Sequence, residues 1–125
     1  MATDTELAIY ELFLNKEELL PLWLRLRPHV ESLGGDIDVE PRERSVEFER
    51  RGREFAIAAP TADHVLELGV HNPGLPFDER FRPADAFGSR RITHRVDLPA
   101  DADIDADLHA RLHAAYALAL DGEPR

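Results

Sequence analysis

The spacing of apolar residues changes once along this chain, from a helical repeat to alternation, and that change sets the fold class. Up to about residue 33 apolar positions recur every three or four residues, which predicts helices over about 4–33. From 36 to 70 apolar and polar residues alternate in short runs, which predicts strands. The connections between these runs are too short for parallel crossovers, so the strands should form an antiparallel meander.

Prolines and glycines divide the helical region from the strands. Pro21 and Pro28 each lack an N–H group and crowd the preceding turn, which predicts a kinked or broken helix. Gly34 and Gly35 follow the last apolar position and are expected to cap the helix at its C-terminal end. Within the meander, Arg51-Gly52 predicts a tight hairpin turn.

The second half of the chain has three expected parts. Prolines and glycines forbid a regular element over 71–89, although its phenylalanines are too apolar for a solvated linker. A fifth strand follows over 91–98, and a helix over about 104–120, with Asp103 as its N-cap. We therefore predict a single domain spanning 1–125. Its fold class is α+β, a small, mainly antiparallel five-stranded sheet with the N-terminal helices and the C-terminal helix packed on one face.

Composition narrows the function classes. The chain has no cysteine, which excludes disulfides, cysteine-based metal clusters and cysteine nucleophiles. Its formal net charge of −10 disfavours general nucleic-acid binding, because phosphate contacts need cationic side chains. The early acidic residues Asp4, Glu6 and Glu11 do not fit a secretory signal, and no apolar stretch approaches the roughly 20 residues that span a bilayer. We expect an acidic, cytoplasmic protein with no membrane contact.

The order of these segments carries a resemblance to a known family. The matching segments are 33–34, 46–48, 53–56, 59–61, 66–70, 81–84, 91–96 and 114–116. Together they cover about 8–118, and the stretch around Thr93-His94-Arg95 is the distinctive one. In this order the chain resembles an uncharacterised bacterial family, domain of unknown function fifty-six fifty-five. The resemblance implies an α+β fold with a small antiparallel sheet, and it implies no activity.

His94 is the first candidate for a functional residue. It shares the apolar face of the fifth strand with Ile92, Val96 and Leu98. A histidine at the edge of a pocket could titrate near neutral pH or donate a hydrogen bond to an anion. The alternative, which we favour, is a buried histidine whose nitrogens hold the strand to the preceding loop.

Arginines and aromatic residues extend this candidate to a possible ligand site. Guanidinium groups bind phosphate or carboxylate in a bidentate manner, and five arginines lie between 80 and 95. If the long loop folds back over the sheet, the ligand-binding residues would be His94, Arg95, Arg91, Arg53, Arg82, Phe48, Phe55 and Phe81. The alternative is that these arginines pair with the surplus of acidic residues or lie on a solvated face.

His109 and His113 also have the spacing of metal ligands on a helix, with Asp105 one turn earlier. The pattern lacks the glutamate of a zincin motif and lies in an acidic stretch, so we interpret it as a solvated helix face. We predict neither a metal ion nor another cofactor.

The leading functional prediction is a small, soluble, non-enzymatic module that binds an anionic small molecule or a protein partner. The alternative is an enzyme that uses His94 as general acid or base, with arginines stabilising an anionic intermediate. A third class, an accessory to nucleic-acid processing through the arginine-rich middle of the chain, is opposed by the overall acidity. The sequence identifies neither the ligand nor the partner, and it leaves the oligomeric state open.

Overall fold

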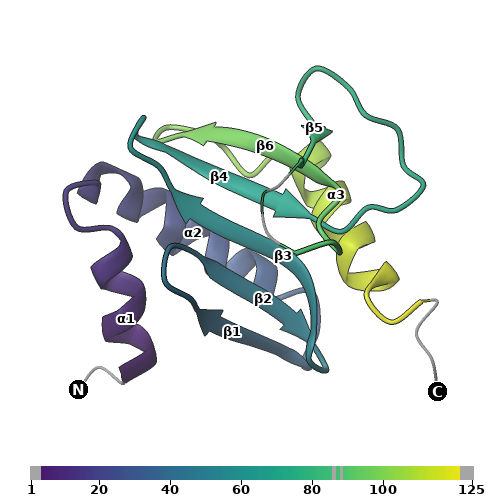
Figure 1. The fold of residues 1–125 in the computed structure, drawn as a ribbon, viewed down its shortest axis with the longest axis horizontal. Coiled ribbons are helices and arrows are strands. Elements are labelled where there is room, and N and C mark those ends of the chain that lie inside the picture. Colours follow the sequence, from purple (N-terminus) through teal and green to yellow (C-terminus); the bar gives the residue numbers. More distant parts are fainter. Residues whose placement is uncertain (1–3, 86, 88, 122–125) are drawn as a thin grey trace.

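Three α-helices, one short 3-10 helix and six strands are present in the part of the chain that the computed structural model describes, residues 4–85, 87 and 89–121. They are α1 (Asp4–Leu12), η1 (Glu17–Leu19), α2 (Leu20–Glu31), β1 (Ile37–Pro41), β2 (Val46–Arg50), β3 (Arg53–Pro60), β4 (Val65–Val70), β5 (Arg82–Pro83), β6 (His94–Pro99) and α3 (Ala106–Leu118). The strands form one antiparallel sheet in the order β1-β2-β3-β4-β6-β5 (Figure 1). The α+β prediction is confirmed, and the sixth strand is the two-residue β5 inside the expected loop.

The N-terminal helical region is broken, but not at its prolines. α1 ends at Leu12 and α2 begins at Leu20, with η1 between them. Pro21 lies in the first turn of α2, where backbone N–H groups make no hydrogen bond within the helix, so the lack of an N–H group in proline costs no helical bond. Pro28 lies inside α2, and the helix continues to Glu31.

The glycines after α2 do not form the expected left-handed cap. The C-cap is Ser32, in a right-handed conformation, and the only described glycines with positive φ are Gly52 and Gly74. Gly34 serves packing instead, because a Cβ atom there would overlap the hydroxyl group of Tyr116. The prediction of a cap was wrong because the sequence alone does not show which side chain approaches a glycine.

The meander forms as the alternating pattern predicts. The β2–β3 hairpin turns through Arg51 and Gly52, with φ values of 51° and 80°. A change of register between Phe48 and Glu49 marks a bulge, after which Glu49 lies opposite Glu54. This bulge places two acidic side chains next to each other on the same face of the sheet.

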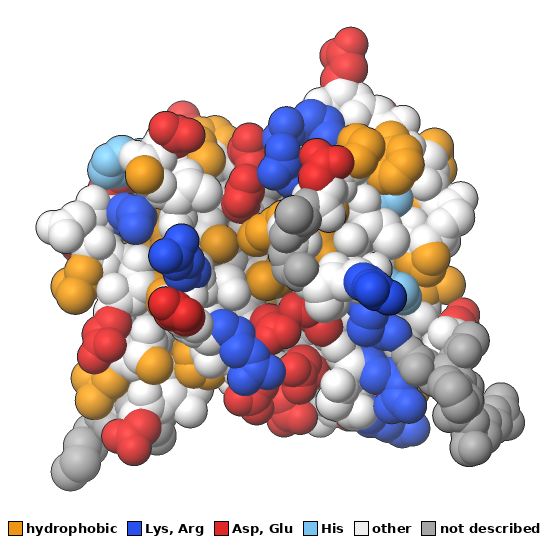
Figure 2. Space-filling model, viewed as in Figure 1, with side chains coloured by type: hydrophobic (Ala, Val, Ile, Leu, Met, Phe, Trp, Pro, Cys, Tyr) orange, Lys and Arg blue, Asp and Glu red, His pale blue; other side chains and the backbone are white. Residues whose placement is uncertain are grey.

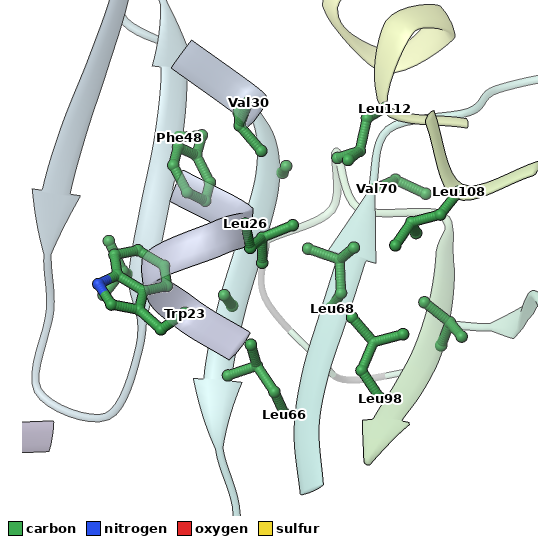
Figure 3. Packing of buried hydrophobic residues seen from close by; sticks show 14 of the residues in the cluster. Trp23, Leu26, Val30, Phe48, Leu66, Leu68, Val70, Leu98, Leu108 and Leu112 are labelled. Atoms are coloured by element: carbon green, nitrogen blue, oxygen red, sulfur yellow. The ribbon is translucent and has the colours of Figure 1, made fainter. Parts of the chain in front are cut away.

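The main core lies between one face of the sheet and the helices α2 and α3, which lie behind the sheet in Figure 1. Figure 3 shows how side chains from α2, α3 and the strands meet there. The labelled members are Trp23, Leu26, Val30, Phe48, Leu66, Leu68, Val70, Leu98, Leu108 and Leu112. α1 lies beside β1 and adds Ile9 to the same core.

The opposite face of the sheet, the open face, carries a smaller apolar cluster. Ile57, Ala84 and Ile92 are buried there, with Phe87 packed against them. They surround Gly69 of β4, where an added Cβ atom would come within 2.6 Å of the Ile92 side chain and 2.8 Å of the Ile57 side chain. The segment between β5 and β6 therefore lies across the middle of the open face.

The final helix begins later than predicted. Its N-cap is Asp105, not Asp103: the Asp105 carboxylate accepts a hydrogen bond from the Leu108 N–H group at 2.9 Å. Asp105 has the extended backbone that an N-cap requires, whereas Asp103 lies in the preceding loop. Three aspartates at alternate positions offered the same local signal, and the packing of Leu108 decides between them.

Candidate functional site

His94 is buried and engaged on both ring nitrogens. Its Nε2 atom lies 3.2 Å from the carbonyl oxygens of Leu75 and Pro76, and its Nδ1 atom lies 2.6 Å from the Thr93 hydroxyl group. This arrangement fits a neutral ring that donates from Nε2 and accepts at Nδ1. Burial lowers the pKa of His94, which keeps the ring neutral. His94 thus ties the start of β6 to the loop at Leu75 and Pro76.

The three phenylalanines of the predicted ligand site lie in the main core. Phe48, Phe55 and Phe81 are each 0% exposed. Arg95 lies opposite Gly69 on the open face, with the sheet between it and that core. The structure therefore does not bring these aromatic rings and Arg95 into one cavity.

The four arginines of the predicted site form two separate pairs. Arg82 lies directly opposite Arg95 in the β5–β6 ladder. Arg82 bonds to Asp97 at 2.9 Å, and Arg95 lies 3.5 Å from Glu67. Both arginines therefore have carboxylate partners within the fold.

The other two arginines lie at the hairpin end of the sheet. Arg91 donates to the carbonyl oxygen of Glu54 at 3.0 Å and to that of Ala119 at 2.6 Å. Arg53 donates to the carbonyl oxygen of Arg51 at 3.3 Å. Arg91 therefore joins β3 to the end of α3.

A group of carboxyl side chains occupies the open face over β2 and β3, in the lower middle of Figure 2. Glu54 hydrogen-bonds to Glu47 and accepts a hydrogen bond from the Ser89 hydroxyl group. Burial and the bond to Glu47 raise the pKa of Glu54 to about 7. Arg42 donates to Glu47 at 2.5 Å, so this carboxylate keeps its charge while Glu54 holds the proton.

A groove of about 410 Å³ lies along β6 and beside the segment that leads to α3. Its lining residues are Glu79, Arg80, Arg82, Val96, Asp97, Leu98, Pro99, Ala102, Asp103 and Asp105. β5 pairs only with His94 and Arg95, so no described strand lies beside the rest of β6 on this side. We call this hollow the β6-edge groove.

Ion pairs hold part of the charged rim of the β6-edge groove in place. Arg80 bonds to Asp105 at 3.0 Å and to Asp107 at 3.2 Å. The hydrogen bond from Arg80, together with the N-cap bond from the Leu108 N–H group, lowers the pKa of Asp105. Asp105 therefore keeps its negative charge at the rim.

The histidines of α3 contact each other and a histidine of α2. His109 lies beside His29 of α2, with Nδ1 and Nε2 2.8 Å apart, and its ring stacks on that of His113. No group of three or more potential ligands suited to a metal ion occurs among the described residues. Within the same residues, no helix has the length and apolar character needed to cross a membrane.

Of the residues that line the β6-edge groove, only Arg82 belongs to the ligand site predicted from the sequence. The available signal was the run of aspartates at alternate positions from 101 to 107, of which we assigned Asp103 to the N-cap of the helix. Glu54 was also missed, because its burial and its hydrogen bond to Glu47 of the neighbouring strand, which together raise its pKa, both depend on the fold.

Comparisons with known proteins agree with the resemblance seen in the sequence. No curated protein and no solved structure matches the chain. One protein family does match, over residues 9–119, and its description is "Domain of unknown function (DUF5655)". The match begins in α1 and ends just after α3, so it takes in every strand of the sheet. The chain therefore belongs to the DUF5655 family, for which no specific function is established.

Proposed function

We propose that this chain is a non-enzymatic binding module that engages its ligand or partner in the β6-edge groove. The observation that carries the proposal is the groove itself, a hollow of about 410 Å³ that lies where β5 leaves β6 uncovered. The cysteine-free composition favours a cytoplasmic setting.

The lining of the groove has the composition of a recognition site. Pro99 and Ala102 supply the apolar surface that is open to solvent, since Val96 and Leu98 are buried in the main core, and charged groups lie around them. Ligand sites commonly combine an apolar floor with a few fixed polar groups that set orientation. Ion pairs hold Arg80 and Arg82 in place, so little side-chain ordering is left for the binding step.

The same lining supports binding more than acid–base catalysis. No histidine, serine or lysine is among the described lining residues. The lowered pKa of Asp105 makes it a poor proton donor at neutral pH. His94, the catalytic candidate of the sequence, lies in the core with both ring nitrogens engaged.

The groove can be tested by filling it. We expect Ala102→Trp to abolish ligand binding, because the indole ring would occupy the apolar floor without changing any charge. Amide NMR spectra would be followed during titration with 1,4-diaminobutane, citrate and glucose, which are cationic, anionic and neutral probes. Ala110→Trp, at an exposed alanine of α3 outside the groove, is the matched control.

In the unmodified protein, at least one probe should shift the amide signals of Asp97, Leu98 and Asp103, and Ala110→Trp should preserve that response. Binding that survives Ala102→Trp, or the absence of any shift at these residues, would count against the proposal.

An anionic small molecule at Arg82 and Arg95 is a second candidate. Two like charges directly opposite in a sheet repel each other, and the Nε atom of Arg95 is buried with no hydrogen-bond partner in the described structure. Asp97 and Glu67 offset part of this repulsion, and a bound anion would offset more of it. We expect anionic metabolites to raise the melting temperature of the protein and Arg95→Ala to remove that rise. A rise that persists in Arg95→Ala would exclude this position.

A further inference from the structure

The rim of the β6-edge groove has an excess of negative charge. Four carboxylates line it, against the two guanidinium groups of Arg80 and Arg82. Each of these arginines is already bonded to an aspartate of the protein. Glu79 and Asp103 are exposed, and neither forms an ion pair or hydrogen bond within the described residues. Two carboxylates are thus left for a positively charged ligand.

The backbone beside these carboxylates is the uncovered part of a strand. The β5–β6 ladder ends at Arg95, and Val96 to Pro99 line the groove. Edge strands present alternate N–H and C=O groups that can pair with an added strand. An extended peptide is the ligand that satisfies such groups, and adding a strand to a sheet edge is a common mode of peptide recognition.

From these two features we infer that the partner of the β6-edge groove is an extended, basic segment of another protein, which lies along β6 and places lysine or arginine side chains near Glu79 and Asp103. This inference rests on the proposed function. An acidic segment would bring like charges together over an apolar floor, which opposes binding. Free cations offer no backbone for the strand edge, so the inference commits to a peptide.

The direct test uses two capped hexapeptides, one of alternating lysine and valine and one of alternating glutamate and valine. Binding to the full chain would be measured by fluorescence anisotropy at low ionic strength. We expect saturable binding of the lysine peptide and none of the glutamate peptide. On binding, the amide protons of the Val96–Leu98 stretch should exchange more slowly with solvent, as expected for strand addition.

Charge removal at the rim tests the assigned contacts. The double variant Glu79→Gln, Asp103→Asn should weaken binding of the lysine peptide by about tenfold or more, the loss expected for two charge-assisted contacts. The control double variant Glu17→Gln, Asp63→Asn removes the same charge at exposed positions outside the groove and should retain the affinity.

The outcomes separate the inference from the proposed function. Equal weakening in both double variants would mean attraction to net charge alone and would overturn the inference. Preference for the glutamate peptide, or for a neutral probe, with loss of binding in Ala102→Trp, would overturn the inference and leave the groove as the site. Absence of binding by every peptide and probe would overturn both.

Discussion

Glu54 is a carboxyl group that the fold withdraws from water. It is 6% exposed, it shares a hydrogen bond with Glu47, and its pKa rises to about 7. In the unfolded chain the same group ionises near its ordinary value of 4.5. Between these two values the native state holds a proton that the unfolded state has released. The free energy of unfolding therefore decreases as pH rises from about 4.5 to about 7.

Glu54→Gln should reduce this pH dependence. Glutamine keeps an acceptor for Ser89 and a donor for Glu47, and it has no charge to bury. We expect the decrease in unfolding free energy between about pH 5 and about pH 9 to be smaller in the variant by roughly 1–3 kcal/mol. Chemical denaturation at both pH values measures this difference. Glu17→Gln, on the exposed surface, should leave the decrease unchanged, and an unchanged decrease in Glu54→Gln would contradict the assignment.

For His94, the sequence predicts the face of the strand on which the side chain lies, but not its hydrogen-bond partners. Alternation placed it correctly on the core side of its strand, since Val96 and Leu98 are buried on the same face. The prediction was wrong for Ile92, because the strand begins at His94 and not at residue 91, and Ile92 lies in the apolar cluster of the open face. Its hydrogen-bond partners could not be predicted from the sequence, because Leu75 and Pro76, which bond to His94, belong to a loop that has no periodic pattern. The partners of the arginines could not be predicted either. An arginine side chain is long, and the group that it contacts depends on which strands are neighbours in the sheet.

At the scale of elements, β4 depends on a glycine near its C-terminal end. Gly69 lies beneath Ile92 and Phe87, and its missing side chain lets the segment before β6 rest on the sheet. We expect Gly69→Ala to destabilise the protein by about 1–3 kcal/mol, because the added methyl group displaces closely packed neighbours.

Urea denaturation of Gly69→Ala and Gly35→Ala provides the matched comparison. A Cβ atom at Gly35 would meet no atom within 4 Å, so this substitution should have little effect. If the two variants lost equal stability, the close packing over Gly69 would not be the cause.

The elements that the sequence predicted well are those with a repeating pattern. The strands between 36 and 70 were predictable because each alternates in register with its neighbour. β5 was not, since Arg82 and Pro83 pair through the backbone alone and two residues carry no periodicity. The start of α3 was misplaced by two residues because the cap is chosen by packing in the first turn.

For the molecule as a whole, one continuous core extends from Ile9 in α1 to Ala119 after α3. That the chain is a single domain over 1–125 stays a prediction. The net charge of −10 is spread unevenly over that core: on the open face carboxyl groups pair with arginines, while the β6-edge groove keeps unpaired carboxylates. Composition predicted the acidity, and only the fold shows where the excess charge lies.

The two-residue length of β5 also bears on how copies of this protein meet one another at high concentration. An uncovered edge strand can pair with the same edge of an identical molecule, which leads to aggregation. Here two such edges would each present Asp97 and Asp103 to the other, and the repulsion between them opposes sticking. The carboxylates of the β6-edge groove, which we propose select a basic partner, would then also oppose self-association of the protein, although β5 is too short to cover the edge.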